Sequence, residues 1–273
     1  MGGKCQNRVD SGLQRGTCSF HCCTLYFTSF PFSNLKLKGT ALSSPIMIII
    51  PRVLVSLVPV LAMSLIGQKG FIDQLVKSGD LRTPEIIYAI SHLDRSDFGR
   101  TQSPYSPELI GFGQTISAFD IHAMACEALY PALVRPNAHI LDVGCGSGYL
   151  TAVFARLNPS ATVYGVDCVP ELVELSRINI NKHNAELFNN DRIKLETFDG
   201  SKGYSPGAPY DAIHVGAAAQ KMPVPLLEQL KVGGMMLIPV GPWEVGQNYL
   251  KVRNILSIEA RLFIQIYIDH ETG

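Results

Sequence analysis

The stretch LDVGCGSGYLTAVFARL, residues 141–157, decides the fold class of this chain. A short apolar run leads into three glycines at alternate positions, Gly144, Gly146 and Gly148, and an apolar pattern of helical spacing follows. A strand that turns tightly into a helix has this composition when a ligand lies close to the backbone of the turn. Dinucleotides, phosphates and methyl donors all bind to glycine-rich turns, so the stretch predicts a ligand site and leaves the ligand open.

The sequence around this stretch alternates between short apolar runs and helical patterns. Five runs have the length and composition of buried strands: residues 139–144, 162–167, 193–198, 212–217 and 235–241. Helical patterns at 169–180 and 222–234 lie between some of them. This alternation predicts an α/β fold, with a mostly parallel, doubly wound sheet of Rossmann-like type and helices on both faces.

Helices are also expected before the first strand. Residues 70–81 repeat apolar side chains at helical spacing and end in a Ser-Gly-Asp stop signal. The next helix is predicted over 83–93, with Thr83 as its cap and Pro84 at its first position. A third is predicted over 120–133, closing near Pro131.

The N-terminal part of the chain has a different character. Residues 1–45 show no sustained periodicity and are expected to form a flexible tail, whereas residues 46–66 are long and apolar enough to span a bilayer. Three interpretations of 46–66 stay open: a membrane anchor, a signal peptide that starts at Met47, and a buried or non-native apolar extension. The globular domain is expected over 67–273.

Charge and composition narrow the classes of function. The chain has 273 residues, of which 47% are hydrophobic, and its 23 Lys and Arg are balanced by 23 Asp and Glu. This is typical of a globular protein with a large core, and it lacks the basic excess that binding to nucleic acid normally requires. We therefore expect no nucleic-acid partner, and nothing in the sequence requires more than a monomer.

The cysteines indicate the compartment. Residues 18–23 hold three cysteines and a histidine, but no second ligand pair stands at a workable distance, so we expect free thiols and no bound metal. Cys126, Cys145 and Cys168 are scattered through the later part of the chain as small apolar residues, as in a reducing compartment. The protein is therefore expected in the cytoplasm.

The spacing of the glycine turn and the acidic residues near it select a ligand. The turn reads G-x-G-x-G and not the dinucleotide G-x-G-x-x-G, and no Gly-Lys-Ser/Thr end of a P-loop follows. Asp167 ends the second strand, where its carboxylate can accept both hydroxyls of a ribose, and Asp199 and Gly200 end the third, where an adenine can be bound. Asp142 either faces an amino group of the ligand or caps a loop or helix. A ligand with ribose, adenine and an amino-acid portion is S-adenosyl-L-methionine.

Several segments resemble one family, the protein-L-isoaspartate (D-aspartate) O-methyltransferases. The resemblance runs from about residue 67 to about residue 249, and IGFGQTIS (110–117) and PYDAIHVGAAA (209–219) carry it more specifically than the glycine turn. It implies a class I methyltransferase fold and S-adenosyl-L-methionine as cofactor. The implied activity is methylation of the α-carboxylate of L-isoaspartyl and D-aspartyl residues in damaged proteins, which starts their repair.

The resemblance also implies the residues of the site. Ser117 is the implied catalytic residue, because its hydroxyl would hold the incoming carboxylate in line; a helix cap is its other interpretation. No general base is expected, because a carboxylate is already ionised at neutral pH. The implied cofactor-binding residues are Ile116, Ser117, Asp142, Gly144, Gly146, Ser147, Asp167, Asp199 and Gly200. The implied substrate-binding residues are Thr115, Val215, Gly216 and Ala217.

The chain departs from the family pattern at two places. The family continues Ser-x-Pro-His-Met-His after its serine, whereas Phe119 and Asp120 replace the proline and first histidine here and His122 matches the second histidine. The C-terminal end lacks the family's Val-Pro-Leu segment. An acidic Asp120 is expected to repel a substrate carboxylate, whereas His122 and His214 are expected to be structural. Two alternatives stay open: an S-adenosyl-L-methionine-binding adaptor without catalysis, and a methyltransferase for another carboxylate.

Overall fold

The predicted alternation of strands and helices forms a seven-stranded sheet in the order β5-β4-β3-β6-β7-β8-β9. The computed structural model describes residues 67–99, 107–242, 247–255 and 263–268. Five strands run parallel: β3 (His139–Val143), β4 (Thr162–Asp167), β5 (Ile193–Thr197), β6 (Tyr210–Val215) and β7 (Leu230–Val240). The antiparallel strands β8 (Asn248–Asn254) and β9 (Phe263–Ile268) extend the sheet beyond β7. The predicted mostly parallel sheet is confirmed.

The order in which the chain adds strands to the sheet changes direction at β3. From β3 the chain moves to β4 and β5 on one side, and then returns to β6 and β7 on the other. The neighbours β3 and β6 pair in register, so that Asp142 lies opposite His214. Ligands of open α/β sheets bind beyond the carboxyl ends of the strands at such a switch point.

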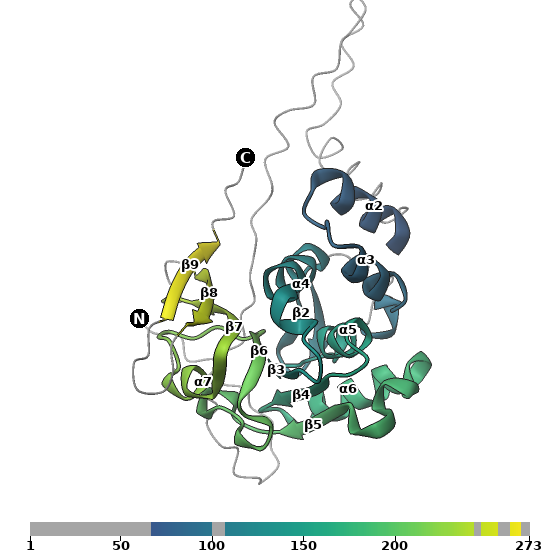
Figure 1. Cartoon of the computed structure of the whole chain (residues 1–273). Coiled ribbons are helices and arrows are strands. Elements are labelled where there is room, and N and C mark those ends of the chain that lie inside the picture. Colours follow the sequence, from purple (N-terminus) through teal and green to yellow (C-terminus); the bar gives the residue numbers. More distant parts are fainter. Residues whose placement is uncertain (1–66, 100–106, 243–246, 256–262, 269–273) are drawn as a thin grey trace, which may run out of the picture.

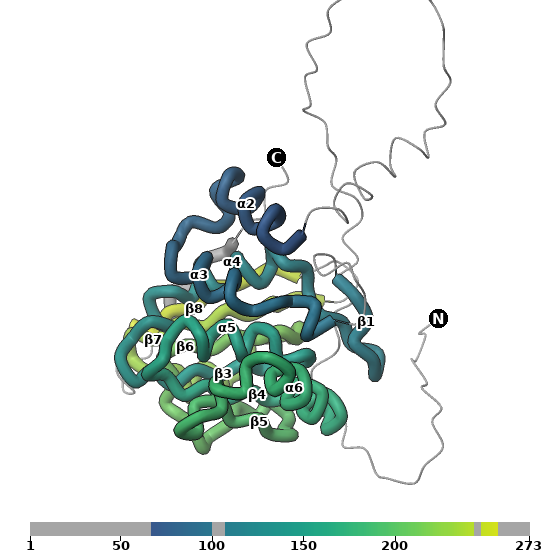
Figure 2. Tube along the Cα trace, turned by 90° about the vertical axis from the view of Figure 1, so that its right-hand side faces the viewer, coloured from purple at the N-terminus to yellow at the C-terminus, as the bar shows by residue number. Residues whose placement is uncertain are grey.

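Helices cover both faces of the sheet, as predicted, but unequally. On one face lie α4 (Phe119–Leu133), α5 (Tyr149–Leu157) and α6 (Pro170–His183), with α2 (Gln68–Ser78) and α3 (Pro84–Ser91) packed beyond them (Figures 1 and 2). The other face carries the short helix α7 (Val224–Gln229) and the 3-10 turns η3 (Gly200–Lys202) and η4 (Ser205–Gly207). Alternate residues of each strand supply the two cores, which explains why the strands read as continuous apolar runs.

The two helices predicted first in the chain form close to their predicted ranges, but the predicted side-chain cap of the second is absent. Gly79 ends α2 in the left-handed conformation, as the Ser-Gly-Asp signal predicts. Thr83 and Pro84 begin α3, but the Thr83 hydroxyl makes no cap and donates instead to Glu127 of α4 at 2.8 Å. A third short helix, η1 (Arg95–Asp97), follows α3 and was not predicted.

Helix α4 ends at Leu133, as predicted, and includes Pro131 in its last turn. Another helix differs from its predicted bounds. The predicted helix over 222–234 is shorter, since α7 ends at Gln229 and β7 begins at Leu230. Pairing of Tyr210 with Leu230 in the sheet replaces the last predicted helical turns.

A separate β-hairpin lies over the carboxyl edge of the sheet. Its strands are β1 (Glu108–Gly111) and β2 (Gln114–Ile116), and Figure 2 shows β1 beside the main sheet. The turn residues Phe112 and Gly113 have φ angles of 56° and 74°, the combination of a type I′ hairpin turn. Alternation alone did not predict this hairpin, because each strand spans only three or four residues.

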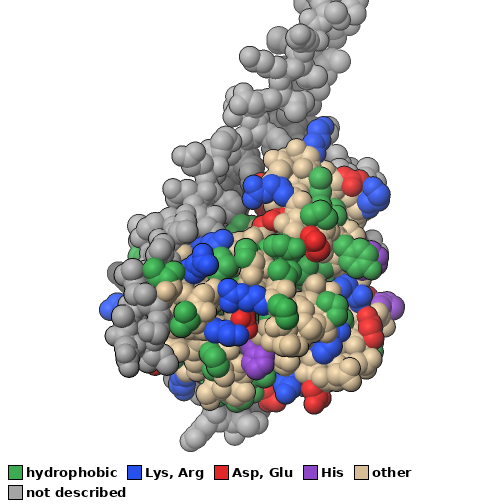
Figure 3. Space-filling model, viewed as in Figure 1, with side chains coloured by type: hydrophobic (Ala, Val, Ile, Leu, Met, Phe, Trp, Pro, Cys, Tyr) green, Lys and Arg blue, Asp and Glu red, His purple; other side chains and the backbone are tan. Residues whose placement is uncertain are grey.

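The predictions for residues 1–66, a tail and an apolar segment, lie outside the described residues. Within the described ranges, no helix has the length and apolar character needed to cross a membrane. On the surface that Figure 3 shows, Lys and Arg side chains lie among acidic and apolar ones.

Candidate active site

A small pocket opens at the switch point, between the carboxyl ends of β3 and β6 and the hairpin strand β2. It brings together three segments that are far apart in sequence: the β2–α4 connection, the glycine turn and the end of β6. Its lining residues are Thr115, Ile116, Ser117, His122, Asp142, Gly144, Cys145, Gly146, Ser147, Tyr149, Leu150, His214 and Gly216.

The glycine turn owes its shape to backbone conformations that side chains disfavour and to contacts with α6. Gly148 precedes α5 with a φ of 84°, and a Cβ there would lie 2.9 Å from the Cβ of Ser176. The Ser176 hydroxyl donates to the Gly146 carbonyl at 2.9 Å, and the Asn179 amide donates to the Ser147 carbonyl at 3.0 Å. Helix α6 therefore fixes the turn, and only glycine fits at position 148.

Asp167 lies at the carboxyl end of β4, beside the turn. One carboxylate oxygen accepts from the Gly146 amide at 3.1 Å, and the other from the Val169 amide at 3.0 Å. Burial raises the pKa of Asp167, and these amides oppose part of that effect. The carboxylate is oriented by backbone donors, as a group that accepts ribose hydroxyls must be.

Asp199 and Gly200 lie at the end of β5 and outside the pocket lining. Asp199 Oδ1 accepts from the Ser201 amide at 3.2 Å and from the Ser201 hydroxyl at 2.7 Å. Its Oδ2 is buried without a hydrogen bond, although Lys202 Nζ lies 3.5 Å away. An unused buried acceptor at this edge fits a bound adenosine, whose amino group donates. A Cβ on Gly200 would lie 2.3 Å from Val143 Cγ1, so the position requires glycine.

The end of β6 contributes the predicted substrate-binding residues in different ways. Gly216 lines the pocket, and its amide donates to the Val143 carbonyl at 2.8 Å. Val215 is buried in the core on the α7 face and does not line the pocket. Ala217 is also outside the lining, but it packs against Gly144, where a Cβ would lie 3.4 Å from the Ala217 Cβ.

Asp142 and His214 form a buried pair beneath the pocket. His214 Nδ1 lies 2.8 Å from Asp142 Oδ1, and the Thr151 hydroxyl donates to Asp142 Oδ2 at 2.5 Å. Both carboxylate oxygens of Asp142 are thus already bound by side chains of β6 and α5, although the residue lines the pocket. His214 is the structural histidine that was predicted, whereas Thr151 was missed because the spacing of a helical threonine carries no signal.

Ser117 lies in the connection between β2 and α4, at the pocket wall. The other interpretation of Ser117, a cap of α4, does not hold: Ala118 is the N-cap residue, and no side chain caps this helix. The Ser117 hydroxyl is half-buried, and its main-chain carbonyl accepts from a guanidinium nitrogen of Arg95. Its neighbours on β2 also line the pocket: Thr115, a predicted substrate-binding residue, and Ile116, a predicted cofactor-binding residue.

Arg95 and His122 form a second buried pair behind Ser117. Arg95 is 1% exposed, and its Nη1 lies 2.7 Å from His122 Nδ1. Burial lowers the pKa of His122 well below its usual range, and the charges of Arg95 and His214 lower it further. Because arginine only donates, Nδ1 accepts and the neutral ring carries its hydrogen on Nε2. No sequence pattern indicated Arg95, because it stands in a polar stretch that is typical of a protein surface.

The residues that depart from the family pattern lie beside this pair. Phe119 is buried, and its ring lies 5.5 Å from Phe71 and 6.3 Å from Tyr149. Asp120 lies in the first turn of α4, where its Oδ1 accepts from the Ile121 amide at 2.9 Å, and it does not line the pocket. A carboxylate in the first turn is favourable for the helix. Among the described residues no group of three or more His, Cys, Asp or Glu is placed to hold a metal ion.

Comparison with known proteins gives consistent matches. A model of the family described as protein-L-isoaspartate(D-aspartate) O-methyltransferase matches residues 67–262. A protein-L-isoaspartate O-methyltransferase of Triticum aestivum is 43% identical over 185 residues, which are 66% of this chain and 80% of that protein. One of Caenorhabditis elegans is 39% identical over 187 residues, 67% of this chain and 82% of that one. A solved structure from Plasmodium falciparum, described as a protein-L-isoaspartate O-methyltransferase in complex with S-adenosyl-L-homocysteine, is 27% identical in sequence and has a TM-score of 0.65. The match covers 74% of this chain and 94% of the Plasmodium chain.

Proposed function

The chain belongs to the protein-L-isoaspartate (D-aspartate) O-methyltransferase family, enzymes that use S-adenosyl-L-methionine, and we propose that its pocket methylates the α-carboxylate of L-isoaspartyl and D-aspartyl residues in damaged proteins. One observation carries the assignment to this pocket. The Thr115–Ser117 segment, which is implied to hold the substrate, and the glycine turn, which is implied to hold the cofactor, line the same small cavity.

The residues present fit the cofactor. When bound, S-adenosyl-L-methionine supplies an electrophilic methyl group on a sulfonium. Asp167 offers a carboxylate oriented by two amides for ribose hydroxyls, and the unused Asp199 Oδ2 offers an acceptor for an adenine amino group. Gly144, Gly146 and Ser147 line the pocket and would hold the amino-acid portion of the cofactor.

The chain's own contribution to the reaction is positioning. The acceptor oxygen of an ionised carboxylate is a nucleophile without further deprotonation, so the site needs no general base. Ser117 is proposed to donate its hydroxyl to this carboxylate and hold it in line with the methyl group, and Thr115 and Gly216 border the same space. Fixing two reactants in reactive geometry contributes up to about 7–11 kcal/mol in well-oriented systems.

The proposed partners are proteins and peptides that contain isoaspartyl residues, and the proposed location is the cytoplasm. The buried free cysteines Cys126 and Cys145 support a reducing compartment. The proposed assembly is a monomer.

The test is transfer of labelled methyl from S-adenosyl-L-methionine to an isoaspartyl peptide and to its aspartyl twin. We expect label on the isoaspartyl peptide alone. Equal labelling of both peptides, or of neither, contradicts the proposal. Calorimetry with S-adenosylhomocysteine then separates a cofactor-binding adaptor, which binds it, from a chain that has lost the cofactor as well.

A further inference from the structure

Arg95 is a buried cation that the proposed reaction does not use. It comes from η1, a short turn far from the glycine motif in sequence, and its side chain crosses the core to the back of the pocket. A charged side chain is costly to bury unless hydrogen bonds satisfy it, so the partners of Arg95 show which segments its position depends on.

The guanidinium reaches two pocket residues at once. Nη2 donates to the main-chain carbonyl of Ser117, and Nη1 donates to Nδ1 of His122 at 2.7 Å. The first bond fixes the connection that carries the Ser117 hydroxyl. The second fixes the tautomer of His122, so that this pocket-lining ring presents an N–H and not a bare nitrogen.

Aromatic rings hold the guanidinium in place. Its central carbon lies 4.9 Å from the centre of the Tyr149 ring and 5.6 Å from that of Phe119. Gln68 of α2 accepts from the Arg95 amide at 2.8 Å and donates to the carbonyls of Ile90 and Leu93. The N-terminal helices therefore set the position of η1, and through Arg95 they set the pocket wall.

We propose that Arg95 is a positioning residue for methyl transfer, which orients Ser117 through its carbonyl and His122 through its ring nitrogen. This inference rests on the proposed function. A planar fork with two separate donors is required, because the two acceptors lie on different segments. Lysine at this position keeps the charge but cannot reproduce the two fixed donor directions.

The test compares R95K and R95M with the unmodified chain. Each is measured for kcat and KM with an isoaspartyl peptide, for affinity to S-adenosylhomocysteine, for thermal stability, and for the ring nitrogens of His122 by NMR. We expect kcat to fall about 10²-fold in both variants, since small misplacements of reacting groups have effects of this size, with a much smaller change in KM. In R95M the NMR signals are expected to show a mixture of His122 tautomers.

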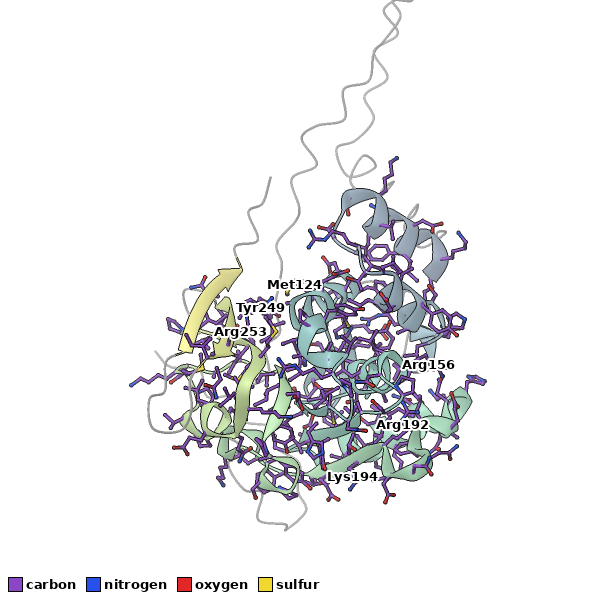
Figure 4. All side chains as sticks on the ribbon, viewed as in Figure 1. Met124, Arg156, Arg192, Lys194, Tyr249 and Arg253 are labelled. Carbon is purple, nitrogen blue, oxygen red and sulfur yellow. The ribbon has the colours of Figure 1, made fainter. Side chains whose placement is uncertain are left out.

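A matched control is R192M. Arg192 is a partly buried arginine that, like Arg95, donates to a backbone carbonyl, here that of Ala155. It lies beside α5 and Arg156 and does not line the pocket (Figure 4). The variant R192M is expected to be less stable than the unmodified chain, with an unchanged kcat and an unchanged His122 tautomer.

The outcomes separate this inference from the proposed function. No transfer by the unmodified chain overturns the function, and this inference with it. Transfer by the unmodified chain with an unchanged kcat in folded R95K overturns the inference alone. If R95M does not fold, R95K still decides, because it keeps the charge and most of the side-chain volume.

Discussion

The imidazole of His214 lies 2.8 Å from the carboxylate of Asp142, on the neighbouring strand and directly opposite it in register. Both side chains are buried, and the second carboxylate oxygen is held by Thr151 of α5. The glycine turn begins two residues after Asp142, so this cluster ties the start of the turn to β6 and α5. Its role is to stiffen the floor of the pocket.

Replacing His214 by phenylalanine should destabilise the protein. H214F keeps the ring but leaves Asp142 Oδ1 buried without a partner, which we expect to lower the free energy of unfolding by about 1–3 kcal/mol. T151V removes the other bond at nearly constant volume and leaves Asp142 Oδ2 buried without a partner, so we expect a loss of similar size, about 1–3 kcal/mol. Urea denaturation of the two variants measures both values. A variant H214F as stable as the unmodified chain would show that the pair does not stabilise the floor.

The variant S117A should lose activity without losing stability. Its hydroxyl does not cap α4, so we expect the free energy of unfolding to change by less than about 0.5 kcal/mol, which is usual away from caps and cores. Turnover should fall by about 10-fold or more, with S-adenosylhomocysteine affinity nearly unchanged. S117T keeps a hydroxyl and should retain more of the rate. A loss of about 1 kcal/mol of stability at full turnover would instead indicate a capping role.

Local sequence pattern predicted much of the frame. The glycine turn and Gly79 lie where the sequence places them, and the five parallel strands overlap their predicted ranges, although β7 begins five residues earlier than predicted. Each of these features depends on neighbours in the chain: apolar runs, positive φ angles and stop signals. The residue types at the strand ends, Asp167 and Asp199, were recognisable for the same reason. A parallel sheet brings strand ends to one edge whatever the details of packing.

The parts of the fold and of the site that the sequence did not predict depend on contacts between distant segments. Arg95 meets His122 across 27 residues, and His214 meets Asp142 across 72 residues. A cap of α4 was the alternative interpretation of Ser117, because this residue stands close to the helix start, but the chain enters the helix one residue later, at Ala118. The last turns predicted for the 222–234 helix gave way to pairing of β7 with β6. Tertiary pairing overrode local preference at each of these places.

Cofactor affinity should depend on the ionisation of Asp167. Burial raises the pKa of this carboxyl above the ordinary 3.8, so it takes up a proton at a higher pH than an exposed aspartate. Only the ionised form accepts hydrogen bonds at both oxygens. We therefore expect affinity for S-adenosylhomocysteine to fall as the pH drops through this raised pKa.

The variant D167N supplies the matched measurement. It should bind S-adenosylhomocysteine about 10–100-fold more weakly at neutral pH, because a pair of charge-assisted hydrogen bonds is lost. Its affinity should not vary with pH across the same acidic range. Calorimetry at several pH values measures both. Parallel pH dependence in D167N and the unmodified chain would assign the titration to another group.

Two glycines with the same backbone angle provide a test of close packing. Gly79 and Gly148 both have a φ of 84°, but a Cβ would meet nothing within 4 Å at Gly79 and would lie 2.9 Å from Ser176 Cβ at Gly148. G79A should therefore cost only the left-handed strain, about 1–2 kcal/mol. G148A should cost about 1–3 kcal/mol more, because it also overpacks the contact between the turn and α6. Equal losses in thermal denaturation would mean that α6 moves away without cost.

Glu127 should stabilise the start of α3 in a pH-dependent way. Partial burial tends to raise its pKa, but bonds from the Thr83 amide, the Arg82 amide and the Thr83 hydroxyl outweigh this and lower the pKa overall. A carboxyl with a lowered pKa contributes stability that is present above its unfolded pKa, near 4.5, and is lost as the pH falls through the lower folded pKa.

The variant E127Q should therefore be less stable than the unmodified chain at pH 7, and the gap should close in acid. We expect a difference of about 1 kcal/mol or less, because the group is only partly buried and solvent partly screens its bonds. D73N, at an exposed residue of α2 paired with Lys69, is the control and should change stability little at any pH. Denaturation curves are measured between pH 3 and pH 7, at pH values about one unit apart. They show whether the difference in stability between E127Q and the unmodified chain decreases in acid. A gap that stays constant over this range would assign the effect of E127Q to packing and not to the charge of Glu127.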